Sequence, residues 1–289
     1  VDWLSGSKSI DLFERRRVSE VVPGDGLINA MLPEWTTYRS EAQKAAVDAW
    51  LFAAPGSTTL VTLPTGEGKS LCTILPPWFD SQGGMFAKGT TIVIVPTIAL
   101  AHDQQKQAQR FFPNTRGDYF EPWSQTGETS TEVRHEIERA ILDGTLPILY
   151  TSPESIIQSR LYGVCLQAAK AGHIARLVID EAHLVETWGA GFRVAFQLLG
   201  TYRRMLLQEG KGQLKTLLLS ATVTRSGFDV LSKLFSEEDN FVSVQANRLR
   251  SEIEYYFDYS HSQKEREQKI LQAMRILPRP LILYVTQPK

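Results

Sequence analysis

The sequence has few cysteines, no long uncharged apolar run and no excess of charge of either sign. Its 289 residues include only Cys72 and Cys165, which lie far apart and among apolar neighbours. Two cysteines are too few for a cysteine-based zinc site, so we expect both to be reduced residues of the core. The apolar runs are too short to span a bilayer, and no signal-peptide pattern follows Val1. We therefore expect a cytoplasmic protein that does not contact a membrane.

The formal charge is close to zero, because 31 lysines and arginines face 32 aspartates and glutamates, which gives −1. This excludes a uniformly basic surface, although a local basic groove for nucleic acid would not change the total. The run Arg15–Arg17 is interpreted as a solvated face. Because the first residue is not methionine, we expect the chain to be part of a longer protein.

Short apolar runs alternate with stretches of helical spacing. The runs that predict buried strands are Thr59–Leu63, Thr90–Val95, Leu146–Tyr150, Leu177–Asp180 and Thr216–Leu219. The helical patterns are Ser40–Phe52, Ile98–Phe111 and Thr131–Leu142. Strands that are apolar throughout and alternate with helices predict an α/β fold, with a mostly parallel sheet covered by helices on both faces. Ligands of such sheets bind beyond the carboxyl ends of the strands.

Other segments suggest local features and domain boundaries. Thr129 and Glu132 form a capping-box pattern, Gly144 is suited to end the following helix, and Asn114–Gly127 is expected to be a loop. After Asn240 the pattern restarts with a strand, a helix and a buried strand, at Ile253–Tyr259, Gln263–Arg275 and Leu281–Val285. We therefore expect an N-terminal extension (1–36), one α/β domain (37–246), and a linker with the beginning of a second domain (247–289).

The first candidate site is a glycine-containing loop between a strand and a helix, Pro64–Ser70. Its glycines, Gly66 and Gly68, allow backbone N–H groups such as that of Thr65 to surround a phosphate, and the next helix adds a favourable dipole. Lys69 is predicted to reach the β- and γ-phosphates of ATP, and the Ser70 hydroxyl to bind Mg²⁺. The strict phosphate-loop pattern is incomplete, because Leu63 stands where its first glycine would be.

The second candidate site is an acidic pair at the end of a predicted strand. Asp180 is expected to hold Mg²⁺ through water, and Glu181 to orient and deprotonate the water that attacks the γ-phosphorus. A solvated acidic turn is the alternative for such a pair alone. His183 is expected either to relay the state of the γ-phosphate or to fill a polar pocket.

Together these motifs resemble the motor core of superfamily-two helicases, and most closely the RecQ-like DNA helicases. The similar segments are the phosphate loop, motif Ia, motif Ib, the DEAH box and motif III, at Leu63–Ser70, Val95–Gln104, Leu149–Glu154, Asp180–His183 and Ser220–Thr222. The resemblance extends from Tyr38 to Thr286. It implies a RecA-like domain that uses ATP and Mg²⁺ to move 3′ to 5′ on single-stranded or partly duplex DNA.

The resemblance also implies roles for individual residues. Tyr38 would stack on the adenine and Gln43 would read its edge, while the role of Arg39 is open because its spacing to Gln43 is one residue longer than in the family. Three residues match the aromatic-rich loop of RecQ-like enzymes, Trp188, Phe192 and Arg193. That loop would join ATP hydrolysis to base stacking, because base–aromatic stacking tolerates any sequence. Without the resemblance, Trp188 and Phe192 would be interpreted as core aromatics.

Four further residues at predicted strand ends are candidates for contact with the phosphate backbone, namely Pro96, Thr97, Ser152 and Pro153. Strand-terminating turns would explain the same residues. Ser220 and Thr222 are expected to form hydrogen bonds to the acidic motif and to help join nucleotide state to domain closure.

Two other classes of function stay open at this point. One is an RNA helicase, or a double-strand translocase of a restriction or defence complex. The other is a nucleotide-dependent switch that moves no strand. The arginines of the family's motifs V and VI are not in the sequence, so we expect this chain alone to bind ATP and hydrolyse it slowly. We expect this chain to be a monomer. We expect it to act in a prokaryotic-like cytoplasm at the nucleoid, with protein partners in a complex for DNA repair, modification or defence.

Overall fold

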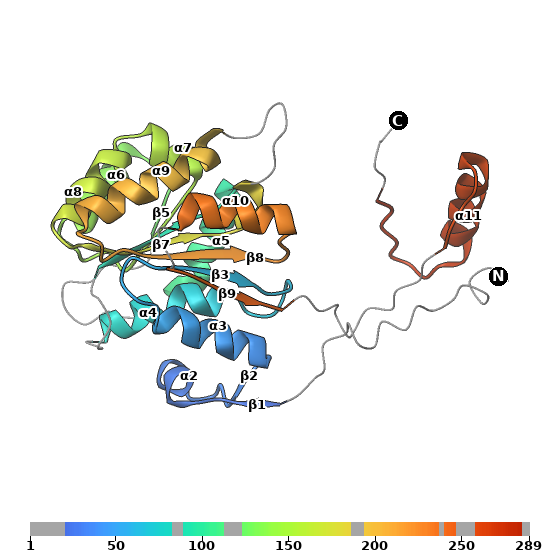
Figure 1. The fold of residues 1–289 in the computed structure, drawn as a ribbon, viewed down its shortest axis with the longest axis horizontal. Helices are drawn as coiled ribbons and strands as arrows, with labels where there is room; N and C mark the ends of the chain where they lie inside the picture. Colours follow the sequence, from blue (N-terminus) through green and yellow to red (C-terminus); the bar gives the residue numbers. More distant parts are fainter. Residues whose placement is uncertain are drawn as a thin grey trace. The chain divides into compact units, whose positions relative to one another are not determined.

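The computed structural model describes residues 21–82, 89–112, 123–185, 194–236, 240–246 and 258–284. By their contacts the described residues fall into two units, the larger before residue 248 and the smaller after it (Figure 1). The larger unit contains every strand in the described part of the chain.

A seven-stranded sheet forms the centre of the larger unit, in the order β5-β6-β4-β7-β8-β3-β9. All of its strand pairs are parallel. The strands are β3 (Thr58–Thr62), β4 (Thr90–Ile94), β5 (Trp123–Gln125), β6 (Ile148–Thr151), β7 (Ile174–Ile179), β8 (Lys215–Ser220) and β9 (Phe241–Gln245). The predicted parallel sheet of a RecA-like domain is therefore confirmed.

Helices cover both faces of this sheet (Figure 1). One face packs against α3 (Glu41–Leu51), α4 (Ser70–Ser81) and α5 (Ile98–Gln109), and α2 (Gly26–Met31) packs on α4. The other packs against α6 (Thr131–Leu142), α7 (Pro153–Gln158), α8 (Leu161–Lys170), α9 (Val194–Glu209) and α10 (Arg225–Phe235). Successive strand residues alternate between the faces, so that Leu60 joins one cluster and Val61 the other. This arrangement explains why the central strands carry apolar residues on both faces.

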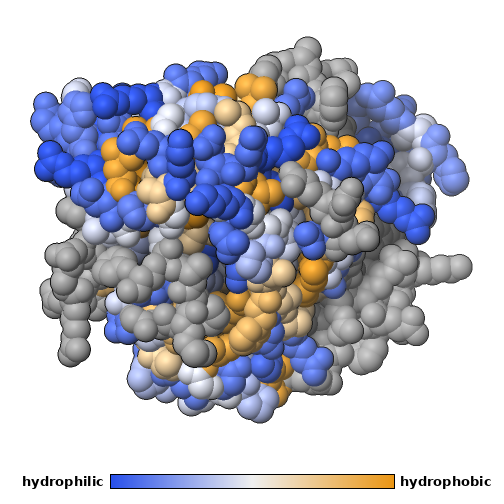
Figure 2. Space-filling view, turned by 60° about the vertical axis from the view of Figure 1, so that its left-hand side comes forward, coloured by the Kyte–Doolittle hydropathy of each residue, from blue (hydrophilic) through white to orange (hydrophobic). Residues whose placement is uncertain are grey.

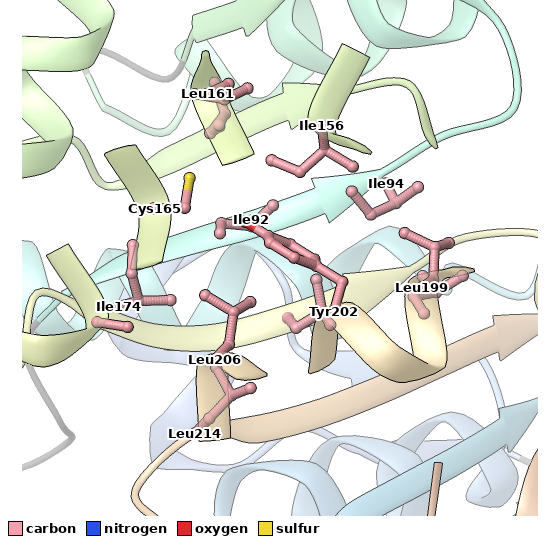
Figure 3. Packing of buried hydrophobic residues seen from close by; sticks show 14 of the residues in the cluster. Ile92, Ile94, Ile156, Leu161, Cys165, Ile174, Leu199, Tyr202, Leu206 and Leu214 are labelled. Atoms are coloured by element: carbon pink, nitrogen blue, oxygen red, sulfur yellow. The ribbon is translucent and has the colours of Figure 1, made fainter. Parts of the chain in front are cut away.

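The core contains both cysteines. Cys165 of α8 packs among Ile92, Ile174 and Leu206 on one face of the sheet (Figure 3). Cys72 of α4 is buried on the other face. Burial raises the pKa of each thiol to about 12. The prediction of core cysteines is therefore confirmed.

In the view of Figure 2, hydrophilic residues cover much of the outer surface.

A buried ion pair joins α4 to β7. Arg176 Nη1 lies 2.7 Å from Asp80 Oδ2, and it also donates to the Thr91 hydroxyl. Each of the two charged residues is 3% exposed. The ion pair joins the C-terminal end of α4 to the N-terminal half of β7. The other ends of these two elements carry Ser70 and precede Asp180.

A small N-terminal element precedes the sheet. Strands β1 (Val22–Pro23) and β2 (Thr37–Tyr38) pair antiparallel on either side of α2. Asp25 caps α2, accepts a hydrogen bond from the Tyr38 hydroxyl at 3.0 Å, and pairs with Lys44 of α3 at 2.9 Å. These contacts place residues 28–38 beside the phosphate loop.

The structure corrects two local predictions in the larger unit. Trp123–Gln125, expected within a loop, form β5 and pair with β6. Ser130 rather than Thr129 caps α6, because the Thr129 hydroxyl accepts the N–H of Thr126 in the preceding turn. Strand β9 was not predicted. Gly144 ends α6 as expected, with a φ of +69°.

The smaller unit consists of α11 (Gln263–Ile276) and the residues around it. This helix confirms the prediction for Gln263–Arg275. The prediction of a buried strand at Leu281–Val285 is wrong for residues 281–284, which form no strand. Ile282, for example, is 74% exposed. The described residues of this unit offer this segment no strand to pair with. The strand predicted at Ile253–Tyr259 lies mostly outside the described residues. Among the described helices, none has the length and apolarity needed to cross a membrane.

Candidate nucleotide site

A pocket of about 730 Å³ lies at the carboxyl ends of β3 and β7. The residues from the phosphate loop that line it are Thr65, Gly66, Gly68, Lys69 and Ser70. Asp180 and Glu181 line it as well. The two sequence motifs are separated by more than a hundred residues, and the fold brings them into one cavity.

The phosphate loop has the backbone that its glycines allow. Gly66 and Gly68 have φ values of +88° and +79°. A Cβ on Gly68 would lie 2.4 Å from Gln43 Nε2, so a larger residue there would displace the Gln43 amide. Gln43 Nε2 donates to Gly68 O at 3.3 Å, and Arg39 Nη1 donates to Gly66 O. Residues of the predicted adenine motif therefore support the phosphate loop directly.

Lys69 is a half-buried cation inside this pocket. Its Nζ donates to Leu63 O at 2.8 Å. Burial lowers the pKa of Lys69, while the carboxylates of Glu181 and Asp180 raise it. A triphosphate in the pocket would supply further negative charge and so stabilise the ammonium form.

The acidic motif begins where β7 ends. Asp180 is 9% exposed, and its Oδ1 accepts the Glu181 N–H at 2.9 Å. Glu181 has a φ of +51°, which is a strained conformation for a residue with a side chain. Its Oε2 lies 3.3 Å from His183 Nδ1, which also contacts Ser220 Oγ at 3.1 Å. Ser220 donates in turn to Thr222 O at 2.8 Å, so motif III lies beside the acidic motif.

The chemistry of these groups fits Mg²⁺. The Ser70 hydroxyl and the Asp180 carboxylate are hard oxygen donors in the same pocket. No group of three His, Cys, Asp or Glu side chains that could hold a metal occurs in the part of the chain that the structure describes. A site with one carboxylate and one hydroxyl suits an ion that takes its other ligands from water and phosphate oxygens.

The pocket also contains residues that the sequence did not indicate. Trp35 and Phe111 line it and contact each other edge to face, with ring centroids 6.3 Å apart. Trp35 is 38% exposed, whereas Tyr38, the predicted stacking residue, lines the pocket at 3% exposure. The signal missed was an aromatic residue three positions before the Tyr38-Arg39 pair.

Gln43 retains capacity for a ligand. Its Oε1 accepts the Arg39 N–H at 2.7 Å, and its Nε2 makes the contact to Gly68 O. A glutamine amide has two N–H donors and two lone pairs, so one of each stays available.

The other predicted site residues lie at strand ends or outside the described residues. The Thr97 hydroxyl caps α5 and the Ser152 hydroxyl caps α7, accepting backbone N–H groups at 3.2 and 3.1 Å. Pro96 precedes the first of these caps, and Pro153 is buried in the first turn of α7. Three residues of the predicted coupling loop lie outside the described residues, Trp188, Phe192 and Arg193.

Comparison with known proteins gives consistent matches. A protein-family model described as DEAD/DEAH box helicase matches residues 40–230. The ATP-dependent helicase SGS1 of Saccharomyces cerevisiae is 32% identical over 208 residues, which cover 71% of this chain and 13% of that protein. The ATP-dependent DNA helicase RecQ of Pasteurella multocida is 32% identical over 160 residues, or 55% of this chain and 22% of that protein. The chain thus spans a minor part of the relatives it matches.

Solved structures match at lower identity. A crystal structure of the DUF1998 helicase MrfA bound to DNA has a TM-score of 0.61 and 19% identity, and covers 80% of this chain and 31% of that one. A DEAD-box helicase bound to single-stranded RNA has a TM-score of 0.57 and 17% identity, over 77% of this chain and 43% of that one. These likenesses show a RecA-like helicase fold. With a family model that matches most of the sheet unit, the chain belongs to the DEAD/DEAH box helicases.

Proposed function

We propose that the chain is the ATP-binding part of a RecQ-like DNA helicase motor, which couples ATP hydrolysis to 3′-to-5′ movement on single-stranded or partly duplex DNA. The observation that carries this proposal is the single pocket that contains Lys69, Asp180 and Glu181. Relatives named as ATP-dependent DNA helicases, such as RecQ of Pasteurella multocida, favour DNA over RNA as the partner. We place its action in the cytoplasm, at the nucleoid.

The residues of the phosphate loop and of the acidic motif have distinct tasks. Lys69 contacts the β- and γ-phosphates, and Ser70 with Asp180 holds Mg²⁺, which when bound supplies positive charge to the phosphates. Glu181 orients the attacking water and accepts its proton. His183, between Glu181 and Ser220, reports the state of the γ-phosphate to motif III.

The base of the nucleotide occupies the part of the pocket beside α2 and β2. Gln43 has a free N–H and a free lone pair for the edge of the adenine. Tyr38 forms a wall of this part, and Trp35 is the more exposed aromatic surface.

The bound nucleic acid strand contacts the surface where β4 and β6 end, near Pro96, Thr97, Ser152 and Pro153. The hydroxyls that cap α5 and α7 lie there, with the N-termini of those helices. Ser220 contacts His183 of the acidic motif and donates to Thr222 O. Through these contacts Ser220 and Thr222 transmit the nucleotide state to the closure of the two motor domains.

We further propose that residues 37–246 are the first RecA-like domain, after an extension of residues 1–36. Residues 247–289 are a linker and the beginning of a second RecA-like domain. The separate contact unit that contains α11 supports this division.

A comparison of ATPase stimulation tests the function. In the full-length protein, single-stranded DNA is expected to stimulate ATP hydrolysis more than duplex DNA or RNA does. Stronger stimulation by RNA would indicate an RNA helicase, and stronger stimulation by duplex DNA a double-strand translocase. A nucleotide-dependent switch would bind ATP without stimulation by any nucleic acid.

Trp188→Ala in the full-length protein tests the coupling loop. Because loss of one base-stacking contact costs about 1–3 kcal/mol, the variant should bind single-stranded DNA more weakly and lose most of the DNA stimulation. Its affinity for a fluorescent ATP analogue should stay unchanged. Unaltered DNA-stimulated turnover would show that Trp188 has no part in coupling.

A further inference from the structure

Helix α5 reaches the acidic motif through one side chain. Gln104 Nε2 donates to Asp180 Oδ2 at 2.7 Å. Its neighbour Gln105 accepts from Ser124 of β5 instead, so the two adjacent glutamines serve different partners. The roles proposed above leave Gln104 without a task, although it lines the nucleotide pocket.

The bond from Gln104 fixes the orientation of the Asp180 carboxylate. Oδ1 accepts the Glu181 N–H and Oδ2 accepts the Gln104 amide, so each oxygen has one protein partner. A carboxylate has about four lone-pair sites, which leaves about two for a metal ion or its water. Removing the Gln104 amide would free the carboxylate to rotate away from the direction that suits the ion.

The same helix begins at the surface proposed for the nucleic acid strand. Thr97 caps α5 and is exposed, while Leu100 and Gln104 line the pocket. These positions are spaced by about one turn each, so they lie along one face of the helix. Strand β4 makes a second link, because the Asp180 N–H donates to Ile94 O, a few residues before α5 begins.

We propose that Gln104 is a positioning residue that holds Asp180 for Mg²⁺ and joins this carboxylate to α5. A strand bound at Thr97 then acts on the metal site through one rigid helix. This inference rests on the proposed function, and it gives the motor a coupling route separate from the loop that contains Trp188.

The direct test measures Mg²⁺ affinity rather than turnover. A fluorescent ATP analogue is bound to the 289-residue chain over a range of Mg²⁺ concentrations. In Gln104→Leu the half-saturating Mg²⁺ concentration should rise about tenfold, the lower end of the effect typical for residues that orient a metal ligand. Gln104→Asn should behave in the same way, because its amide is shorter by one carbon–carbon bond of about 1.5 Å. Affinity for the analogue without Mg²⁺ should not change.

Gln208→Leu is the matched control, because Gln208 is an exposed glutamine on α9 that does not line the nucleotide pocket. It should keep the wild-type Mg²⁺ dependence, and all variants should keep the wild-type thermal midpoint. In the full-length protein, both Gln104 variants should also lose part of the stimulation by single-stranded DNA at saturating Mg²⁺.

The outcomes separate this inference from the proposed function. A wild-type chain with Mg²⁺-dependent nucleotide binding, together with Gln104 variants that match it, would overturn the role of Gln104 alone. A wild-type chain whose nucleotide binding does not respond to Mg²⁺ would overturn the proposed function itself.

Discussion

Glu181→Gln is expected to lower DNA-stimulated ATP turnover by about 10²–10⁴-fold, the usual contribution of a general base. The amide keeps the size of the side chain but cannot accept the proton of the attacking water. The substitution should leave nucleotide binding close to wild type, because Lys69 and the phosphate loop are unchanged. Steady-state ATPase assays of the full-length protein, with binding of a fluorescent ATP analogue, separate the two effects.

Glu136→Gln provides the control for this experiment. Glu136 is exposed on α6, and the same chemical change there should not affect turnover. Turnover of Glu181→Gln within a few-fold of wild type would assign the proton to another acceptor.

Asp80→Ala is expected to destabilise the sheet unit by about 3–5 kcal/mol, because it removes the carboxylate partner of the buried Arg176. For a unit of this size, each kcal/mol lowers the thermal midpoint by about 2–4 °C, so the midpoint should fall by about 10 °C. Differential scanning calorimetry measures this change.

The double variant Asp80→Leu with Arg176→Met separates charge from packing. Replacing both partners of a buried ion pair with apolar residues is often neutral or stabilising. The double variant should therefore be more stable than Asp80→Ala. If it is equally unstable, the loss comes from packing around α4 and not from an unpaired charge.

The central strands could be predicted from the sequence because parallel strands buried on both faces contain apolar runs with few charged residues, although β3 also buries Thr58, Thr59 and Thr62. Thr90–Val95 differs from β4 by a single residue. The edge strands gave no such signal. β5 has three residues of mixed polarity, and β9 has only partly buried and exposed positions. Both depend on a neighbouring strand that local sequence does not reveal.

The candidate site divides in the same way. Lys69 and Asp180 belong to motifs whose spacing follows from the chemistry of phosphate and Mg²⁺. Trp35 and Phe111 reach the pocket from separate elements, so their meeting depends on the packing of the N-terminal segment against α5. Ser130 caps α6 instead of the predicted Thr129. The sequence does not distinguish two adjacent hydroxyl residues, and in the structure the Thr129 hydroxyl accepts the Thr126 N–H instead.

The position of β3 in the sheet has a consequence for biosynthesis. This strand leads into the phosphate loop, yet its two neighbours are β8 and β9, which pair with Thr58 through Thr216 and Phe241. On the ribosome these are the last strands of the sheet to emerge, and pairing across such a separation along the chain is slow. The nucleotide site is therefore among the last parts of the unit to be completed, although its motif is translated early.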